Sequence, residues 1–268
     1  MTTDLLAHGW PGQPAIVVGV VRSGDATILR SSGDLTERRP WASVSKLCAA
    51  LAALRVVESG RHDLDEPAGP EGSTLAHLLA HASGLGFELG DRVVPVGTRR
   101  VYSNAGIDLM GELLAPGDPA EWVRESVLEV LELSSATLEG RISADVVAST
   151  QDMVSLAREL LSPALLSVAM NERMRTPFLP ELAGITPPFG RQVPNWWGLG
   201  PELKGTKEHW MGHWPAESFG HFGRSGSMLL ADPTTGLFIC ATSTEGFGPW
   251  AVELWPAWVD EVRTSVLS

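Results

Sequence analysis

The clearest pattern of apolar positions is an unbroken run over residues 47–54 that contains only leucine, alanine and one cysteine. Leucine and alanine are strong helix formers, and Gly60 supplies a stop signal. The pattern therefore predicts one buried helix over residues 43–59. Its first turn holds Ser43 and Lys46, and residues three apart share one face of a helix. A hydroxyl and an amine are thus expected side by side at a helix N-terminus.

Apolar runs rich in β-branched residues predict strands near both ends of the chain. One run at residues 15–21, a turn at residues 23–25 and a second run at residues 26–30 predict a β-hairpin. Three further strand patterns lie at residues 218–222, 227–231 and 237–242. An amphipathic pattern over residues 250–266 predicts a closing helix.

The middle of the chain is predicted to be mostly helical or irregular. A short helix is expected over residues 74–81, and residues 121–131 have helical spacing. Ser149 and the three residues after it resemble a capping box that opens a helix over residues 153–161. Residues 177–194 are proline-rich and predict a long irregular connection.

Strands at both ends with helices between them imply a sheet assembled from the two terminal parts of the chain. We expect residues 1–60 and 195–268 to form the sheet-containing region, and residues 61–194 to form a mostly helical inserted region. The two regions would make one compact unit. The fold class is accordingly α/β in the α+β sense, with an antiparallel sheet flanked by terminal helices.

Composition narrows the class of protein. With 268 residues, 44% hydrophobic and 19% charged, the chain is typical of a globular protein that buries a large core. A net charge of −12 opposes binding to nucleic acid or to an anionic membrane surface. No run is long and apolar enough to span a bilayer, and residues 1–8 lack the basic end and apolar centre of a secretory signal. A cytoplasmic location is therefore expected, and Cys48 and Cys240 are interpreted as core residues rather than a disulfide.

Lys46 is notable because the chain has only three lysines, the others being Lys204 and Lys207. Apart from histidine, every other cationic side chain is arginine, which keeps its proton in proteins. A lysine in an apolar helix fits a need for an amine that can lose its proton and act as a base toward Ser43. The alternative interpretation is a snorkelling lysine whose stem covers apolar surface at the end of the helix.

Two further segments carry candidate chemistry. Tyr102 is the only tyrosine and stands two residues before Asn104, so a phenol and an amide lie close together in the chain. A phenol near a lysine can relay a proton, and an amide offers a donor and an acceptor to a substrate, although a lone tyrosine can also be an ordinary core residue. In residues 219–227, glycines flank His221 on a predicted strand. Glycine in a strand often marks the close approach of a ligand or of another backbone.

These segments, in this order, resemble the class C β-lactamase-like serine hydrolases. That family includes serine β-lactamases, D,D-peptidases (penicillin-binding proteins), D-amino-acid peptidases and esterases. Ser43-Val44-Ser45-Lys46 resembles the family's S-x-x-K motif, Tyr102-Ser103-Asn104 its Y-x-N motif, and His221-Phe222-Gly223 the H-x-G variant of its K-T-G strand. Residues 78–85 and 197–200 agree as weaker motifs, so the resemblance covers most of the chain and implies a β-lactamase/transpeptidase-like fold.

The resemblance implies a role for each matched residue. Ser43 would attack an acyl carbonyl and become acylated, while Lys46 and Tyr102 would share the proton transfers. Asn104 would hold the acyl side of the substrate. The backbone N–H groups of Ser43 and Arg224 would form the oxyanion hole, next to His221, Phe222 and Gly223 on the strand. No metal and no cofactor are implied.

Departures from the family pattern bear on the substrate. His221 replaces the lysine of K-T-G, and Phe222 stands where β-lactam-directed relatives carry a hydroxyl for the substrate carboxylate. The loss of that hydroxyl and the gain of apolar bulk argue against efficient recognition of a β-lactam or of D-Ala-D-Ala. They favour a neutral or apolar acyl group, and the expected substrate is a small ester, amide or peptide. A β-lactamase or D,D-peptidase is the alternative enzyme, and a non-catalytic binding module that keeps the fold is a third hypothesis.

Other candidate sites have simpler explanations. His209 and His213 have the i, i+4 spacing of a helical metal site, but they lack the catalytic glutamate and lie in a glycine-containing stretch. His77 and His81 share that spacing, and the resemblance makes His81 structural. Four tryptophans are expected either to line an apolar acyl pocket or to pack a loop, namely Trp196, Trp197, Trp210 and Trp214.

Overall fold

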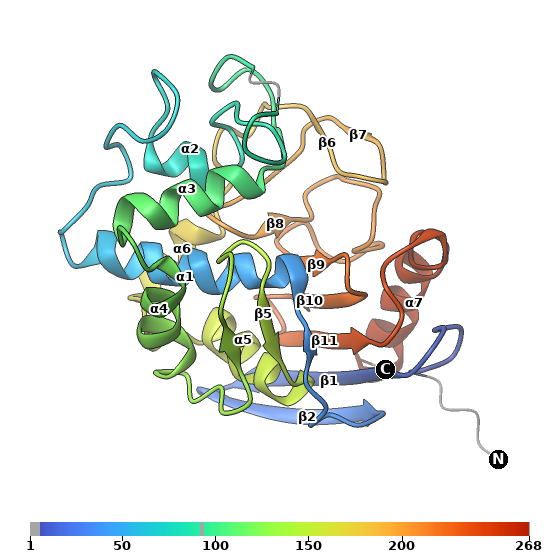
Figure 1. The fold of residues 1–268 in the computed structure, drawn as a ribbon. Coiled ribbons are helices and arrows are strands. Elements are labelled where there is room, and N and C mark those ends of the chain that lie inside the picture. Colours follow the sequence, from blue (N-terminus) through green and yellow to red (C-terminus); the bar gives the residue numbers. More distant parts are fainter. Residues whose placement is uncertain (1–5, 92–93, 268) are drawn as a thin grey trace.

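A six-stranded antiparallel sheet forms the centre of the protein, in the strand order β2-β1-β11-β10-β9-β8. The computed structural model describes residues 6–91 and 94–267. The strands of the sheet are β1 (Pro14–Arg22), β2 (Asp25–Ser32), β8 (Glu202–Leu203), β9 (Phe219–Gly223), β10 (Ser227–Ala231) and β11 (Leu237–Ser243). The predicted N-terminal hairpin and the three later strands are therefore confirmed, and segments from both ends of the chain lie side by side (Figure 1).

Side chains of each central strand divide between two cores because successive residues of a strand face opposite ways. In β1, Val17 joins the core formed with the inner helices, while Ile16 and Val18 join the core under the C-terminal helix. The strand is buried on both faces, which explains its nearly continuous β-branched sequence. The β1–β11 register, with Val17 opposite Cys240, fixes this division along the sheet.

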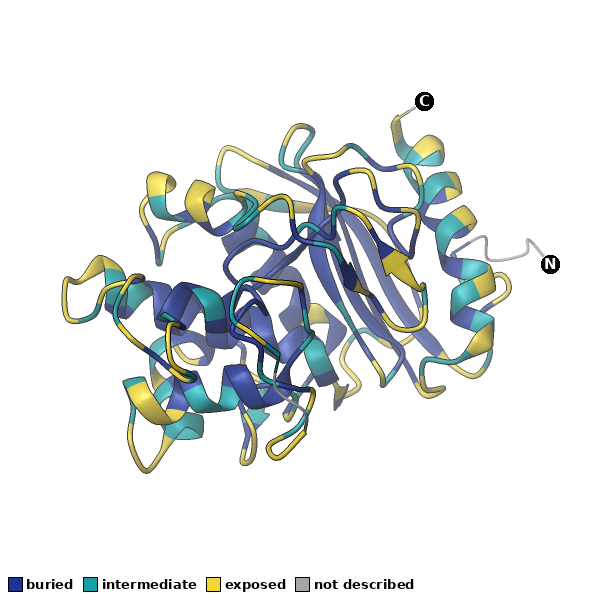
Figure 2. Ribbon diagram, turned by 90° about the horizontal axis from the view of Figure 1, so that it is seen from above, coloured by how far each residue is buried: buried dark blue, intermediate teal, exposed yellow. Residues whose placement is uncertain are grey.

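Helix α7 (Pro249–Leu267) covers one face of the sheet and ends the described chain. It buries Trp255 and Trp258 against the strands, and Trp10 packs edge-on to Trp258 with ring centroids 5.2 Å apart. Its outward face is exposed, whereas the strands beneath it are buried (Figure 2). The predicted amphipathic closing helix is confirmed.

The opposite face of the sheet packs against helices from the first and middle parts of the chain. Helix α1 (Ser45–Glu58) follows a 3₁₀ turn, η1 (Ala42–Val44), and is buried on almost every side. Helix α5 (Thr150–Leu161) packs on the sheet beside it. The Ser149 side chain accepts a hydrogen bond from the Asp152 N–H at 3.0 Å, so the predicted cap is present.

The remaining helices pack around α1, with α2 and α3 on its side away from the sheet (Figure 1). They are α2 (Leu75–Leu79), α3 (Asn104–Leu114), α4 (Pro119–Val123) and α6 (Val168–Met174). The helix predicted over residues 121–131 instead divides into α4 and a π-helical turn, η2 (Arg124–Leu128). The Arg55 guanidinium donates a hydrogen bond to the Ser126 carbonyl within that turn, and an outside donor of this kind disturbs a regular helical ladder.

Short strands complete the fold where the sequence predicted irregular structure. Strands β3 (Arg39–Pro40), β4 (Thr137–Leu138) and β5 (Val146–Ala148) form a small sheet, and β6 (Gly184–Ile185) pairs with β7 (Arg191–Gln192) inside the proline-rich connection. Strands of two or three residues carry too few positions to show a period. The overall mixed α/β architecture agrees with the predicted fold class, and the division into two regions stays a prediction.

Within residues 6–91 and 94–267, no helix has the length and apolar character needed to cross a bilayer. Cys48 and Cys240 are both buried and unpaired, as expected of core cysteines. The N-terminal segment without signal-sequence character spans residues 1–8, of which residues 1–5 lie outside the described part.

A buried ionic cluster joins β8 at the edge of the sheet to the loop that follows it. The Glu202 carboxylate accepts hydrogen bonds from Lys207 Nζ and Trp210 Nε1, both at 2.7 Å, and lies 3.3 Å from His209 Nε2. Desolvation raises the pKa of Glu202, but Lys207 and His209 outweigh it and hold that pKa well below its usual value. The cluster keeps a charged pair in the interior, next to the strand that carries His221.

Replacement of Lys207 by methionine should destabilise the protein by about 3–5 kcal/mol, because it leaves the buried Glu202 carboxylate without its counterion. In the wild type the depressed pKa of Glu202 keeps its contribution to stability down to the ordinary carboxylate range. In the variant, burial without a counterion should raise that pKa, so the carboxyl takes up a proton as the pH falls and the penalty should shrink between pH 7 and pH 4. Urea unfolding of wild type and Lys207→Met at both pH values measures this. The double variant Lys207→Met/Glu202→Gln should recover part of the loss, and an equal penalty at both pH values would contradict the ion-pair explanation.

Candidate active site

The turn that carries Ser43 is fixed on two sides before α1 begins. The Trp41 N–H donates to the Val146 carbonyl at 2.8 Å, and the Trp41 carbonyl accepts from Ser227 Oγ at 2.7 Å. Ala42 has a φ of 45°, which is strained for a residue with a side chain. Ser43 itself is only partly buried, so its hydroxyl stands at the N-terminal end of the helix with access from outside.

Gly223 ends β9 directly against this turn. A Cβ atom on Gly223 would lie 2.4 Å from Ser227 Oγ, 2.5 Å from the Trp41 carbonyl oxygen and 2.9 Å from the Ala42 Cβ. Only glycine permits so close an approach of backbone to backbone. The strand predicted to carry half of the oxyanion hole therefore lies beside Ser43.

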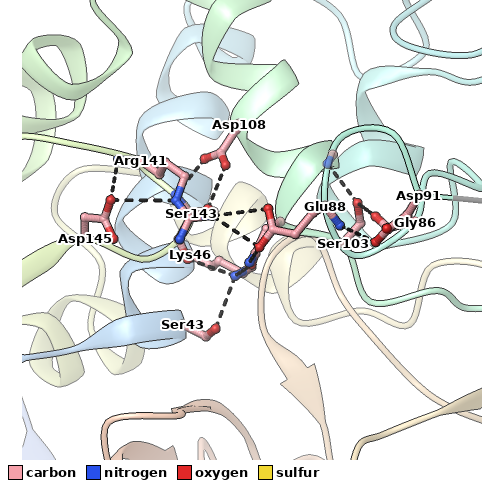
Figure 3. Close-up of polar contacts among 12 residues, drawn as sticks. Ser43, Lys46, Gly86, Glu88, Asp91, Ser103, Asp108, Arg141, Ser143 and Asp145 are labelled. Atoms are coloured by element: carbon pink, nitrogen blue, oxygen red, sulfur yellow. Dashed lines mark hydrogen bonds and ion pairs between the residues drawn. The ribbon is translucent and has the colours of Figure 1, made fainter.

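Lys46 is completely buried, and its amine contacts three oxygen atoms (Figure 3). Nζ lies 2.6 Å from Asn104 Oδ1, 2.8 Å from the Ser143 carbonyl oxygen and 3.3 Å from Ser43 Oγ. Burial lowers the pKa of Lys46 to about 7, with Asp108 opposing that shift. Near neutral pH the amine is thus divided between its charged and neutral forms.

The partners of Lys46 determine what its neutral form can do. A neutral amine has two N–H donors and one lone pair, and the Asn104 and Ser143 oxygens can only accept. With both N–H groups given to those oxygens, the lone pair is left for the Ser43 hydroxyl proton. The snorkelling interpretation fails, because the amine points into the protein and not toward solvent.

Tyr102 lies over Lys46 and is surrounded by aromatic rings. Lys46 Nζ is 4.8 Å from the centroid of the phenol ring, and His81, Trp197 and His221 lie 4.7, 5.6 and 5.8 Å from it, centroid to centroid. Burial raises the pKa of Tyr102, while the neighbouring Ser43 hydroxyl opposes the rise. The phenol oxygen is buried, and in the described part of the chain it has no partner that meets hydrogen-bond geometry with it. The phenol is therefore neutral and free to exchange a proton with a group that approaches Ser43.

Asn104 begins α3, and the helix cap sets its position. The Ser103 side chain accepts from the Gly106 N–H at 2.8 Å, which starts the helix directly after Tyr102. The Asn104 amide points its oxygen at Lys46 and its nitrogen at Glu88 Oε1, 2.9 Å away. The Y-x-N segment thus places a phenol and an amide on either side of the same amine.

His221 projects from β9 toward Tyr102 and Trp197, on the helical side of the sheet. Burial and the charge of Lys46 lower the pKa of His221 to about 3, so the ring is neutral at physiological pH. Its Nδ1 lies 2.8 Å from the Phe222 carbonyl oxygen, which can only accept, so Nδ1 carries the proton. Nε2 is then an acceptor, and among residues 6–91 and 94–267 it has no partner.

The side chains of Phe222 and Arg224 do not share the environment of His221. Successive strand residues face opposite ways, and the Phe222 ring packs on Phe247, Trp210 and Trp255 at centroid distances of 4.9, 5.5 and 5.9 Å. Arg224 has an exposed side chain, and its carbonyl accepts from the Phe247 N–H at 2.9 Å. The structure therefore brings Ser43, Lys46, Tyr102, Asn104, His221 and Gly223 together, and turns Phe222 toward the α7 core.

The chain is similar to known proteins over nearly its whole length. Residues 4–262 match the family model described as Beta-lactamase. The chain belongs to the beta-lactamase family. A beta-lactamase structure from Mycobacterium bovis is 36% identical, with 96% of each chain covered and a TM-score of 0.90.

Two more distant structures share the fold of this beta-lactamase family member. An octameric penicillin-binding protein homologue from Pyrococcus abyssi is 16% identical, with 95% of this chain and 73% of that chain covered and a TM-score of 0.71. EstCE1, a hydrolase with promiscuous acyltransferase activity, is also 16% identical, with 92% and 93% covered and a TM-score of 0.72. No curated protein matches the chain.

Several residues beside the site were not predicted from the sequence. Asp108 accepts from the Ser143 N–H at 3.0 Å and from Ser143 Oγ at 2.9 Å, which holds the Ser143 carbonyl toward Lys46. Asp108 follows Asn104 by four residues on α3, so helical spacing was an available signal for it. Ser143, Glu88 and Arg141 stand in loops, where no periodic pattern marks them.

The two histidine pairs with metal-site spacing do not form a shared site, because each histidine has a different partner. His209 faces the buried Glu202, whereas His213 is exposed and lies 2.7 Å from Asp260. His81 accepts from the Ser103 N–H through Nδ1 at 3.2 Å and supports the Tyr102 ring, while His77 Nδ1 lies 2.8 Å from the Thr74 hydroxyl. The described residues contain no group of three or more His, Cys, Asp or Glu that could hold a metal ion.

The four tryptophans that the sequence suggested for an acyl pocket have different roles. Trp197 packs on Tyr102 and His221, while Trp210 and Trp214 belong to the α7 core. Trp196 donates from Nε1 to the Pro180 carbonyl at 2.9 Å. Of the four, Trp197 is thus the one that contacts the candidate catalytic rings.

Replacement of Gly223 by alanine should destabilise this beta-lactamase family member by about 1–3 kcal/mol, since the new methyl group overlaps the Trp41–Ala42 backbone. The displaced turn should also slow modification of Ser43 by a fluorophosphonate. Gly248→Ala is the matched control, because its nearest neighbour would be 3.6 Å away. Thermal unfolding and labelling rates measure both effects, and a Gly223→Ala protein that behaves like the control would contradict the close approach.

Proposed function

We propose that the protein is a serine hydrolase that cleaves a small ester or amide through an acyl-enzyme on Ser43. The observation that carries this proposal is the hydrogen bonding of Lys46. Two acceptors use its N–H groups and leave its lone pair for the Ser43 hydroxyl. A base held in this way, with a pKa near 7, is suited to activate a serine.

The reaction begins when the Ser43 oxygen bonds to the acyl carbon as its proton passes to Lys46 Nζ. The carbonyl oxygen takes up the negative charge and accepts hydrogen bonds from the backbone N–H groups of Ser43 and Arg224, each contributing about 3 kcal/mol to the transition state. The tetrahedral intermediate then collapses, and the alcohol or amine leaves with a proton delivered through Lys46 and Tyr102. Water attacks the acyl-enzyme by the same route in reverse and restores Ser43.

Tyr102 and His221 have different roles in these reaction steps. The raised pKa of Tyr102 keeps the phenol neutral, so it can pass one proton on while it receives another. His221 stays neutral beside it and offers Nε2 as an acceptor, without the charge that a lysine would bring. Asn104 keeps one N–H of its amide for the acyl side of the substrate.

The substrate class follows from the surface of β9. A neutral His221 and an aromatic Phe222 give the strand no cation or hydroxyl side chain for a carboxylate. This supports a neutral or apolar acyl donor, and the shared fold with EstCE1, a hydrolase with promiscuous acyltransferase activity, is compatible with it. The cytoplasmic location expected from the sequence stays part of this proposal.

A β-lactamase is the second candidate, because the 36% identical Mycobacterium bovis structure carries that description. The residue type at position 222 counts against it, because phenylalanine has no hydroxyl for a substrate carboxylate, and its ring packs on the α7 side. Nitrocefin turnover, or a stable penicilloyl adduct on Ser43, would favour this second candidate over an esterase.

Ser43→Ala should abolish both fluorophosphonate labelling and the hydrolysis of short p-nitrophenyl esters, because it removes the atom that becomes acylated. Mass spectrometry of the labelled wild-type protein locates the adduct. Ser265→Ala, which changes a serine on the outer part of α7, is the control and should label normally. Absence of labelling and of ester hydrolysis in folded wild-type protein would favour a non-catalytic binding module.

The pH dependence of kcat/KM should report the titration of Lys46. Because burial lowers the pKa of Lys46 to about 7, the neutral base accumulates above that pH, and activity should rise with pH through about 7. The raised pKa of Tyr102 should keep the rate level up to at least the ordinary phenol range of about 10. Lys46→Arg should lower kcat at least about a thousandfold, since a guanidinium keeps its proton, and a profile flat across pH 5–9 would contradict Lys46 as the base.

A further inference from the structure

We propose that Glu88 and Arg141 form a charged bridge that positions both hydrogen-bond acceptors of Lys46 and sets the electrostatic field at its amine. This inference rests on the proposed hydrolytic role of Ser43 and Lys46. It concerns two residues that no sequence motif marks. Both lie within the group of polar contacts around Lys46 (Figure 3).

One end of the bridge holds Asn104. Glu88 belongs to the loop between α2 and α3, and the carbonyl of its neighbour Phe87 accepts from the Asn104 N–H at 2.9 Å. Glu88 Oε1 accepts from Asn104 Nδ2 at 2.9 Å. A carboxylate can only accept, so it draws the nitrogen of the amide to its side and leaves the amide oxygen facing Lys46. Glu88 therefore fixes which way the Asn104 amide points.

The other end of the bridge belongs to the turn that carries Ser143. The Asp145 side chain accepts from the Arg141 N–H at 2.8 Å, and the Arg141 carbonyl accepts from the Asp145 N–H at 2.9 Å. This closed turn presents the Ser143 carbonyl to Lys46 at 2.8 Å. Arg141 Nη1 then lies 3.2 Å from each carboxylate oxygen of Glu88. The bridge thus joins the loop that orients Asn104 to the turn that supplies the carbonyl.

Stability alone does not explain this ion pair. The Arg141 and Glu88 side chains are 44% and 45% exposed, and pairs of that kind typically contribute less than about 1 kcal/mol. Their position matters more, because each partner stands next to a group that touches the amine. The consequence of removing either one should therefore appear in the chemistry of Lys46 before it appears in unfolding.

The charges of the bridge act on Lys46 in opposite directions. Burial is the main cause of its lowered pKa, Arg141 lowers that pKa further, and Glu88 raises it. Asp108 on α3 and Asp145 on the turn also raise the pKa of Lys46. The other titratable side chains near the amine are neutral, namely Tyr102 before α3, His81 after α2 and His221 on β9. Because the two side chains of the bridge carry opposite charges, removing each should shift the pKa of Lys46 in its own direction, and the two contributions can be measured separately.

The test measures the pKa of Lys46 without relying on activity. The chain has three lysines, so a protein labelled with ¹³C at lysine Cε gives three signals, and the one lost in Lys46→Met is assigned to Lys46. The pKa of Lys46 should fall by about half a unit in Glu88→Gln and rise by about half a unit in Arg141→Met. The exposed pair of Arg124 and Glu129 supplies controls, and Arg124→Met and Glu129→Gln should leave the titration unchanged.

Kinetics on an activated ester provide the second readout. The acid limb of kcat/KM should move with the Lys46 titration, to lower pH in Glu88→Gln and to higher pH in Arg141→Met. Glu88→Ala should lower kcat/KM about tenfold at its optimum, whereas Glu88→Gln should retain most of it, because glutamine keeps an acceptor for the Asn104 amide. This separates positioning from charge.

Each outcome bears on one proposal. Shifts of the Lys46 titration in the same direction in both variants, or no shifts, would overturn the bridge even if both variants lose activity. A wild-type protein that shows no labelling at Ser43 would overturn the proposed function alone, because the titration still reports whether the bridge acts on Lys46.

Discussion

The burial of one amine is the constraint on which the rest of the structure depends. Lys46 lies inside the protein, where the charged form loses its hydration and the neutral form becomes accessible near pH 7. Such a group is tolerated only if oxygen atoms surround it. Asn104, Ser143 and Ser43 supply them from three separate parts of the chain. The fold can be understood as the arrangement that brings those three parts to one point.

The two cores of the sheet make that arrangement rigid. α1 is packed on almost every side, so Lys46 has no route to solvent along its own helix. β9 lies next to β10 and ends against the turn before Ser43, and the Ser227 hydroxyl ties the two together. A strained Ala42 survives there because packing and hydrogen bonds on both sides determine its conformation. His221 and Gly223 are therefore held near Ser43 by a regular strand and not by a loop.

Most of the fold could be predicted from local sequence patterns. The features that could not be predicted depend on contacts between residues that are far apart in the chain. The strands around Val17 and Cys240 and the cap at Ser149 follow from periods and residue types within a few positions, and the structure confirms them. The π-helical turn after α4 accepts a hydrogen bond from Arg55, some seventy residues earlier, and helical spacing within residues 121–131 gives no signal of that contact. In the same way the three motif segments marked Ser43, Tyr102 and His221, but nothing in the chain connects Glu88 with Arg141.

The proposed substrate class depends on two groups that β9 lacks, a cationic side chain and a hydroxyl side chain. A lysine at position 221 would add a second cation beside Lys46, whereas the neutral His221 ring adds no charge there. The Phe222 ring packs on the α7 core, and the exposed Arg224 side chain lies beyond the end of β9. With a net charge of −12 the whole molecule also repels anions. These features are the grounds for proposing an acyl donor without a carboxylate.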